Sequence, residues 1–382
     1  MIVPDYHGGS IVNLMASLIH ALGGEEALYS PLRGLAPEAL AGRSVVLLVV
    51  DGLGMEYLRE RRPAGALARH LRGRMTSVFP STTTTAITTF LTGTAPQHHA
   101  LTGWFMYFRE IATLAAVLPY QARHGNTALA VAPETLLEHV PVFARVPVRS
   151  YMVAPKSIAH SAFNTAHLGR AHLEAFDTLG EMFDTLARIV RAPGERRYVY
   201  AYWPELDRLG HKYGMESARA AQHLAEIDDA FERFLAAVAG SDTSIVVTAD
   251  HGFVDTPADR VVALEAHPEL ERMLVLPPCG EPRVAYCYVA ADQREAFVDY
   301  VGEHLGACAD LHESEFLIES GWFGLGTPHP RLRERVGDFT LVMKDNAMLE
   351  SWLLGEKRFR FVGVHGGTTT REMYVPLIVA QV

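Results

Sequence analysis

The chain has 382 residues, of which 49% are hydrophobic and 20% are charged, as is typical of a globular protein with a sizeable core. Its net charge of −10 excludes a nucleic-acid polymer as the expected partner, because phosphate backbones attract basic patches. The three cysteines, Cys279, Cys287 and Cys308, form no CxxC pair and indicate neither a disulfide framework nor a thiolate metal site.

The first predicted element is an amphipathic helix near the N-terminus. Polar residues interrupt the apolar stretch from Ile11 to Leu22, with Ser10 as its expected N-cap and Gly23-Gly24 as its end. The stretch has no basic leader, and the chain has no run of 18 apolar residues. We therefore expect a cytoplasmic enzyme with no membrane partner. The sequence does not indicate an oligomeric state.

Four short apolar runs, rich in β-branched and aromatic residues, are typical of buried parallel strands. They are Ser44 to Val50, Arg197 to Trp203, Ser244 to Thr248 and Tyr374 to Ala380. Helical patterns at Leu168 to Val190 and Ser217 to Ala239 lie between them. This alternation predicts an α/β fold, a doubly wound and mostly parallel sheet with helices on both faces. Its ligand site is expected at the carboxyl ends of the strands.

The stretch 256–361 has a different pattern. Apolar runs at Arg283 to Val289 and Asp338 to Met343 flank a helical pattern at Gln293 to His304. We expect 256–361 to be an inserted α+β cap subdomain, with 1–255 and 362–382 forming the core. A second, loop-rich and aromatic insert is expected from Thr102 to Pro155.

Carboxylates and imidazoles lie shortly after the predicted strands or, in one case, before the last of them. They are Asp51 in VVDGLG, Asp207 and His211 in ELDRLGHKYG, Asp250 and His251 in TADHGF, and His365 in FVGVHGG. Three Asp and three His without a thiolate suit Zn²⁺, with Mn²⁺ or Fe as alternatives. Six ligands are too many for one tetrahedral zinc and divide well between two ions. Two metals about 3.5–4 Å apart are a usual clamp for displacement at phosphorus.

Each of these positions also has a simpler structural interpretation. An Asp at a strand end often caps a helix, and an Asp and a His four residues apart often form a surface ion pair. A His-Gly pair is common in turns, where glycine adopts positive φ. The coincidence of such residues at separate strand ends, each beside glycine, favours the metal interpretation.

A run of threonines occurs in VFPSTTTTAITTFLTG, residues 78–93. The helical spacing of Ile87, Phe90 and Leu91 places the run at a helix N-terminus, where free N–H groups attract phosphate. A metal-bound hydroxyl at this point could act as a nucleophile. Capping by Thr82 or Thr83, with packing of the other threonines, is the structural alternative.

In this order, the motifs resemble the alkaline phosphatase superfamily and, within it, the type I phosphodiesterase / nucleotide pyrophosphatase branch. The motifs span 45–379, although most of 256–361 has no recognisable signal. The resemblance implies that Pro80-Ser81-Thr82-Thr83, followed by Thr92-Gly93, ends in the nucleophile Thr83, which forms a covalent phospho-threonine. It also implies one zinc held by Asp51, Thr83, Asp250 and His251, and a second zinc held by Asp207, His211 and His365.

Two positions differ from the family pattern. Thr84 stands where a base-stacking aromatic residue is usual, and Trp104 stands where a phosphate-contacting asparagine is usual. We expect both to contact the substrate, and the two differences weaken the case for a nucleotide. The expected activity is zinc-dependent hydrolysis of a small phosphate ester, with diesters favoured. The alternatives are a phosphonate C–P hydrolase of the phosphonoacetate hydrolase type, a phosphomonoesterase, and a non-catalytic protein that binds metal and phosphorylated ligands.

Overall fold

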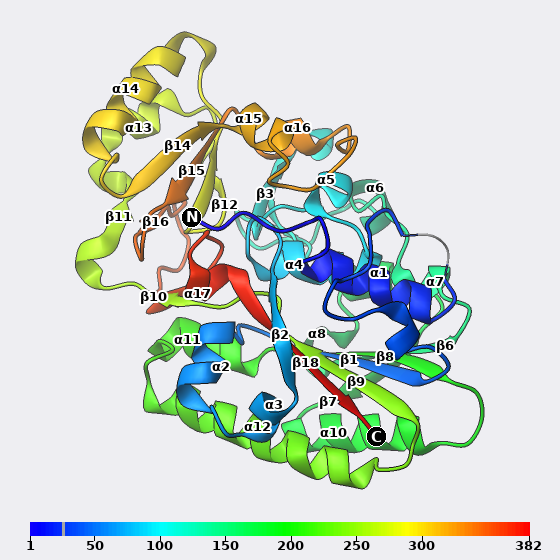
Figure 1. The fold of residues 1–382 in the computed structure, drawn as a ribbon. Coiled ribbons are helices and arrows are strands. Elements are labelled where there is room, and N and C mark those ends of the chain that lie inside the picture. The colour runs from blue at the N-terminus through cyan, green and yellow to red at the C-terminus, as the bar shows by residue number, and fades with distance from the viewer. Residues whose placement is uncertain (25–26) are drawn as a thin grey trace.

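The computed structural model describes residues 1–24 and 27–382, and its core is a seven-stranded sheet. In order across the sheet, the strands are β2 (Leu71–Thr76), β18 (Tyr374–Gln381), β9 (Thr243–Thr248), β1 (Ser44–Val50), β8 (Arg197–Trp203), β6 (Arg149–Pro155) and β7 (His172–Phe176) (Figure 1). The central strand β1 is parallel to both β8 and β9, and every residue of these three strands is buried. Burial on both faces explains why their sequences are apolar without alternation.

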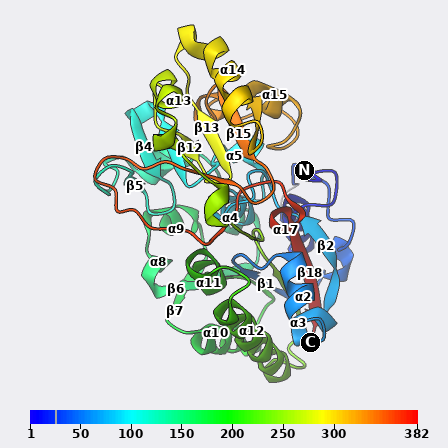
Figure 2. The same ribbon diagram turned by 90° about the vertical axis from the view of Figure 1, so that its left-hand side faces the viewer.

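Helices cover both faces of this sheet (Figures 1 and 2). One face carries α1 (Ile11–Ala21) and α4 (Thr83–Thr92); the other carries α2 (Met55–Arg61), α3 (Ala66–Arg69), α10 (Leu179–Arg191) and α12 (Ala218–Ala237). The main hydrophobic core lies between these layers. The doubly wound α/β fold is therefore confirmed. Within the described residues, no helix combines the length and the apolar character needed to cross a membrane.

Shorter helices complete the core and its loops. They are α5 (Pro96–His99), α6 (Pro133–Leu136), α7 (Val142–Arg145), α8 (Lys156–Ala159), α9 (Ala162–His167), α11 (Glu205–Tyr213) and α17 (Thr370–Met373). Of these, α11 and α17 flank the strand ends that are described below.

The continuous helix predicted from Leu168 to Val190 is wrong in its first half. Residues His172–Phe176 form β7, an edge strand parallel to β6. The helix α10 begins only after Thr178, where Thr178 and Glu181 form a capping box. Most residues of β7 are exposed or half-buried, so the apolar pattern of the strand is weak, and its pairing with β6 outweighs local propensity.

The last strand also differs from the prediction, because β18 runs antiparallel to both β9 and β2. A parallel strand needs a crossover of about a dozen residues or more to return the chain to the other end of the sheet. Only the short loop with α17 separates β18 from His365, which lies at the carboxyl edge of the parallel strands. The chain therefore has to run away from that edge.

A second, antiparallel sheet lies above the core in Figure 1. Its strands are, in order, β14 (Ala309–Glu313), β15 (Phe339–Met343), β13 (Val284–Cys287), β12 (Cys279–Gly280), β3 (Phe105–Phe108), β4 (Thr113–Ala116) and β5 (Gln121–Ala122). The first four come from 256–361 and the other three from the insert near 102–155. The two segments that interrupt the core thus share one sheet, through the pairing of Gly280 with Phe105.

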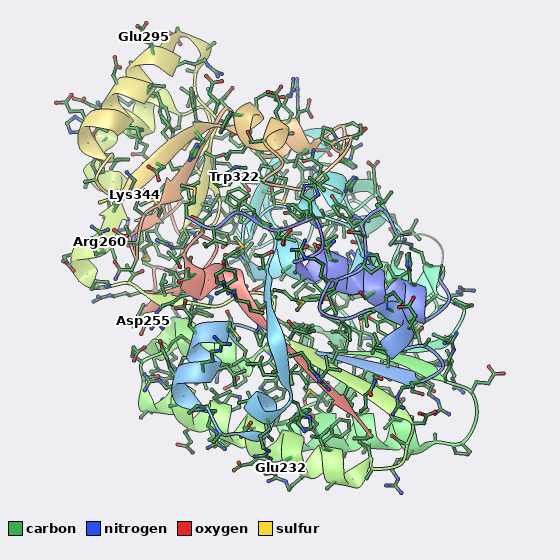
Figure 3. All side chains as sticks on the ribbon, in the orientation of Figure 1. Glu232, Asp255, Arg260, Glu295, Trp322 and Lys344 are labelled. Atoms are coloured by element: carbon green, nitrogen blue, oxygen red, sulfur yellow. The ribbon has the colours of Figure 1, made fainter. Side chains whose placement is uncertain are left out.

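Further elements of 254–364 pack on this sheet or join it to the core. They are α13 (Pro268–Met273), α14 (Arg294–His304), α15 (Ser314–Glu319), α16 (Leu332–Arg335), the parallel pair β11 (Val261–Ala263) and β16 (Met348–Glu350), and the antiparallel pair β10 (Val254–Asp255) and β17 (Gly363–Val364). The carboxylate of Asp255, labelled in Figure 3, accepts hydrogen bonds from the backbone N–H groups of Met215 and Glu216 where the chain leaves the core. Trp322, also labelled there, packs edge-to-face on Phe79, just before α4.

Candidate active site

Three adjacent strands of the core sheet bring the predicted site residues to one edge. Asp51 directly follows β1, Asp250 and His251 follow β9, and α11 follows β8 and carries Asp207 and His211. Because β1, β8 and β9 are parallel, their carboxyl ends lie side by side. The loop between β17 and β18 adds His365 at the same edge.

The first cluster surrounds the start of α4. His251 Nε2 lies 3.4 Å from Asp51 Oδ1, 3.4 Å from Asp250 Oδ2 and 3.1 Å from Thr83 Oγ1. The side chains of all four residues are buried. This is the set of residues that the family resemblance assigned to one zinc.

The second cluster adjoins the first. The Oδ1 atom of Asp207 lies 3.4 Å from His211 Nε2 and 3.5 Å from His365 Nε2, and the two Nε2 atoms are 3.1 Å apart. The rings of His365 and His251 stack at 3.6 Å between centroids. The ligand atoms of Asp207, His251 and His365 also lie within 4.8 Å of one another, so His251 stands between the two clusters.

The donor atoms of these clusters suit a divalent cation. Asp51 Oδ1, Asp207 Oδ1 and Asp250 Oδ2 are buried and have no hydrogen-bond partner, which is costly for a carboxylate oxygen without a cation. Burial and the neighbouring carboxylates raise the pKa of both Asp51 and Asp207, because negative charges crowd together here. A bound cation would remove this repulsion, so the residues fit the metal that the sequence predicts.

Two of the three candidate histidine ligands, His211 and His251, are held in the form that binds metal. His211 Nδ1 lies 2.9 Å from the Gly363 carbonyl and His251 Nδ1 lies 3.1 Å from the Gly252 carbonyl, so each Nδ1–H donates and leaves Nε2 with a lone pair. Burial lowers the pKa of His211 to about 4 and also lowers that of His251. Both rings are therefore neutral at pH 7, as a metal ligand must be.

Glycines permit the close packing of the strand-end loops. Gly52 has φ +75°, and a Cβ at this position would lie 2.6 Å from the ring of Phe253. A Cβ at Gly252 would lie 2.0 Å from the Arg371 carbonyl oxygen. The glycines beside Asp51 and His251 therefore serve backbone geometry, and larger residues would displace the two loops.

The threonines of this run differ in their surroundings: some lie at the N-terminus of α4, and the others pack inside the protein. Thr82 is the N-cap of α4 and Thr83 its first residue, and every residue of the helix is buried. The hydroxyls of Thr88 and Thr92 donate to the carbonyls one turn earlier, at 2.6 Å and 2.8 Å. Most of these threonines therefore pack inside the protein, and Thr83 is the one whose hydroxyl meets the candidate metal ligands.

A cavity of about 780 Å³ opens over the two clusters. Thr83, Asp207, His211 and His365 form part of its lining. Trp104, expected to contact the substrate, lines the cavity and is 36% exposed. Thr84 is fully buried in α4 and lies outside the lining, so the structure places it away from the space where a substrate would bind.

Sequence reasoning missed two polar residues beside the site. The Tyr202 hydroxyl donates to Asp51 Oδ2, the oxygen that faces away from the cluster. The sequence shows Tyr202 only as a tyrosine near the end of a predicted strand. The register of β8 on β1 is what places it beside Asp51. Glu281 accepts hydrogen bonds from Thr82 Oγ1 at 2.5 Å and from the Trp104 amide at 2.7 Å, and burial raises its pKa to about 7. No local pattern marks Glu281.

Solved structures with this fold include phosphate-processing proteins. Murine ectonucleotide pyrophosphatase / phosphodiesterase 5, as an inactive variant in complex with AMP, is 16% identical with a TM-score of 0.66 over 88% of this chain and 87% of that one. Phosphonoacetate hydrolase from Sinorhizobium meliloti 1021, in complex with phosphonoformate, is 18% identical with a TM-score of 0.66 over 88% and 90% of the two chains. At these identities the likeness establishes the fold.

The family assignment rests on the sequence match. The type I phosphodiesterase / nucleotide pyrophosphatase family model matches residues 45–368, which include every predicted metal ligand and Thr83. No curated protein sequence is significantly similar to the chain. The family implies a divalent metal, in agreement with the donor set described above. The chain therefore belongs to the type I phosphodiesterase / nucleotide pyrophosphatase family of phosphoester hydrolases.

Proposed function

We propose that this chain hydrolyses small phosphate esters with two Zn²⁺ ions and a covalent phospho-threonine at Thr83. The supporting observation is the convergence of carboxylate and imidazole groups on the Thr83 hydroxyl at the first turn of α4. One ion would be held by Asp51, Thr83, Asp250 and His251, and the other by Asp207, His211 and His365. Carboxylate and imidazole donors favour Zn²⁺, with Mn²⁺ or Fe at one site as the alternative.

In this proposal the Thr83 oxygen attacks phosphorus. When bound, the ions supply positive charge that lowers the pKa of the hydroxyl and stabilises the charge on the phosphoryl and leaving oxygens. The hydroxyl loses its proton to solvent, and its oxygen forms the new bond to phosphorus. The ester P–O bond breaks, its electrons go to the leaving oxygen, and that oxygen takes up a proton. Water then cleaves the phospho-threonine, restores the hydroxyl, and releases phosphate from a monoester or a phosphomonoester from a diester.

Other features of the chain orient the reacting group. Because Thr83 is the first residue of α4, a phosphoryl group on its oxygen would lie beside the free backbone N–H groups of the first turn of that helix. The hydrogen bonds from His211 and His251 to backbone carbonyls fix the orientation of both rings. The nucleophile and its neighbours are thus held in place by rigid elements before a substrate arrives.

Removing the metal should abolish turnover. We expect about two zinc ions per purified chain and loss of bis-p-nitrophenyl phosphate hydrolysis after dialysis against a chelator. Adding back Zn²⁺, Mn²⁺ or Fe²⁺ singly and in pairs identifies the productive metals. Metal content is measured by mass spectrometry, and turnover by release of p-nitrophenolate. Fewer than one bound metal per chain in excess zinc would contradict the two-ion proposal.

The same preparation separates the alternative reactions. Bis-p-nitrophenyl phosphate, p-nitrophenyl phosphate and phosphonoacetate report diester, monoester and C–P hydrolysis, respectively. The family assignment favours the diester. A zinc-loaded chain that turns over none of the three would favour a binding protein over an enzyme.

Replacing Tyr202 by phenylalanine should weaken zinc binding by roughly 10- to 100-fold, as is usual when a hydrogen bond to a metal ligand is lost. Asp51 would then lose the hydroxyl that orients its carboxylate. Competition with a chromophoric chelator measures the affinity. Tyr200→Phe is the matched control, because the Tyr200 hydroxyl lies in the same strand and has no hydrogen-bond partner. Equal affinities of the two variants would show that Tyr202 does not support the site.

A further inference from the structure

One irregular segment, 351–361, forms part of the lining of the cavity, and we call it the strap. It follows β16 and precedes β17, and Trp352, Phe359 and Phe361 from it line the cavity. In Figure 2 the strap, in orange-red, reaches across to β5. One wall of the cavity is therefore made by a segment that directly precedes the loop of His365 and is far in sequence from Asp51 and Thr83.

Arg123 holds the strap in this position. Its guanidinium donates to both carboxylate oxygens of Glu356, at 2.9 Å and 3.1 Å, and to the Ser351 carbonyl at 2.6 Å. It also donates to the Pro278 carbonyl and lies 4.2 Å from the centroid of the Phe105 ring. Arg123 is buried, and these contacts use most of its N–H groups. The positive charge of Arg123 is therefore already paired with Glu356 and is not free to bind a phosphate or carboxylate of a ligand.

Aromatic rings connect the strap to the second cluster. The ring centroid of Phe361 lies 4.7 Å from that of His211, Phe359 lies 4.6 Å from Phe361, and Trp352 lies 5.3 Å from Phe359. Phe359 is 54% exposed, although it belongs to this ladder. An exposed ring at the wall of a cavity gains free energy when another apolar ring covers it.

The cavity offers little to a second anionic group. Apart from the candidate metal ligands, the basic side chains among the described lining residues are Arg123, His124 and Lys357. Arg123 is paired with Glu356, and His124 and Lys357 are exposed to solvent. Two further carboxylates, Glu281 and Glu350, line the same space. Beyond the two proposed metal ions, which face the phosphoryl group, the described lining residues offer no free buried cation to balance a carboxylate or second phosphate on the substrate.

We infer that the cavity takes a phosphate ester whose organic group is an uncharged aromatic ring, packed against Phe359 and Trp352 of the strap. This inference rests on the proposed function, because it places the phosphoryl group at Thr83. It assigns Phe359 and Trp352 to substrate specificity and Arg123 to positioning of the strap. It also excludes phosphonoacetate, whose carboxylate would face Glu281 and Glu350, as the preferred ligand.

Calorimetric titration of the full-length, zinc-supplemented chain tests this inference. The three ligands are phenylphosphonate, methylphosphonate and phosphonoacetate, each of which has a single phosphonate group. We expect phenylphosphonate to bind about tenfold or more tightly than methylphosphonate, since burial of the ring contributes apolar contact, and more tightly than phosphonoacetate. Phe359→Ala should reduce the preference for phenyl over methyl severalfold. Arg358→Ala is the matched control, because Arg358 belongs to the strap, pairs with Glu265 at the surface and does not line the cavity.

The outcomes separate the inference from the proposed function, because turnover of bis-p-nitrophenyl phosphate is measured in the same samples. Turnover without a phenyl preference, or tighter binding of phosphonoacetate, would overturn the inference and leave the proposed function standing. Phe359→Ala and Arg358→Ala could also reduce the phenyl preference equally. That result would show that the strap has only a structural role, and it would overturn the inference as well. A phenyl preference without turnover would support the specificity of the cavity and contradict the proposed function.

Discussion

Thr83→Ala should lower the turnover of bis-p-nitrophenyl phosphate by roughly 10³-fold or more, because it removes the proposed nucleophile itself. The hydroxyl lies 3.1 Å from His251 Nε2 at the first turn of α4, within the first cluster. The variant should retain the fold, since Thr83 lines a cavity and the loss of its hydroxyl and γ-methyl groups there leaves no enclosed void. Turnover is measured as p-nitrophenolate release, and acid-quenched protein is digested to locate a phosphoryl adduct by mass spectrometry. We expect the adduct on the peptide that contains Thr83 in the wild type and not in the variant.

Two further variants isolate the hydroxyl from the helix that carries it. Thr85→Ala makes the same chemical change two residues along α4, where the hydroxyl is buried without a partner and does not line the cavity. It should keep most of the activity. Thr83→Ser keeps a hydroxyl and should recover part of the activity lost in Thr83→Ala. Wild-type turnover by Thr83→Ala, or an adduct on another residue, would show that the nucleophile lies elsewhere.

Arg283→Met should lower the free energy of unfolding by about 3–5 kcal/mol, the usual cost of leaving one charge of a buried pair without its partner. Arg283 and Glu372 are both fully buried and joined by two hydrogen bonds of 2.9 Å. Burial alone would raise the pKa of Glu372, but the charge of Arg283 outweighs it and the pKa is lowered. Glu372 also accepts from the Gly367 amide at 2.8 Å, in the loop that carries His365. Losing Arg283 should therefore weaken the second cluster as well as the fold, which urea unfolding and zinc titration measure separately.

The chain offers a matched exposed pair as a control. Arg358 donates to both carboxylate oxygens of Glu265 at 3.0 Å and 2.6 Å, but both side chains are 60% exposed. Arg358→Met should therefore cost less than about 1 kcal/mol. The double variant Arg283→Met/Glu372→Gln should be more stable than Arg283→Met, because no unpaired charge remains. Equal destabilisation of Arg283→Met and Arg358→Met would contradict the prediction that burial makes the loss of one charge more costly.

Local sequence patterns were sufficient to predict those elements in which the burial of each residue can be inferred from the neighbouring residues in the chain. The strands β1, β8 and β9 are buried on both faces, so their apolar runs gave nearly correct bounds. Parallel strands present their carboxyl ends at one edge, and this rule brings Asp51, Asp207 and Asp250 together without further information. The bounds of α1 likewise followed from Ser10 and the glycines after it.

Other features depended on contacts between segments far apart in the sequence. The direction of β18, the strand β7 and the sheet shared by the two inserts are decided by which strand lies alongside, and a single segment does not contain that information. Tyr202 acquires its role only through the register of β8 on β1. The sequence shows the strap only as a polar and aromatic loop. The hydrogen bond from Arg123 to Glu356 holds it in place as a wall of the cavity. The sequence by itself therefore determined the fold class and the chemistry of the metal ligands, because strand ends and residue types determine both. Only the tertiary structure decided what lines the cavity beside those ligands, because its wall is assembled from residues that meet only in the folded chain.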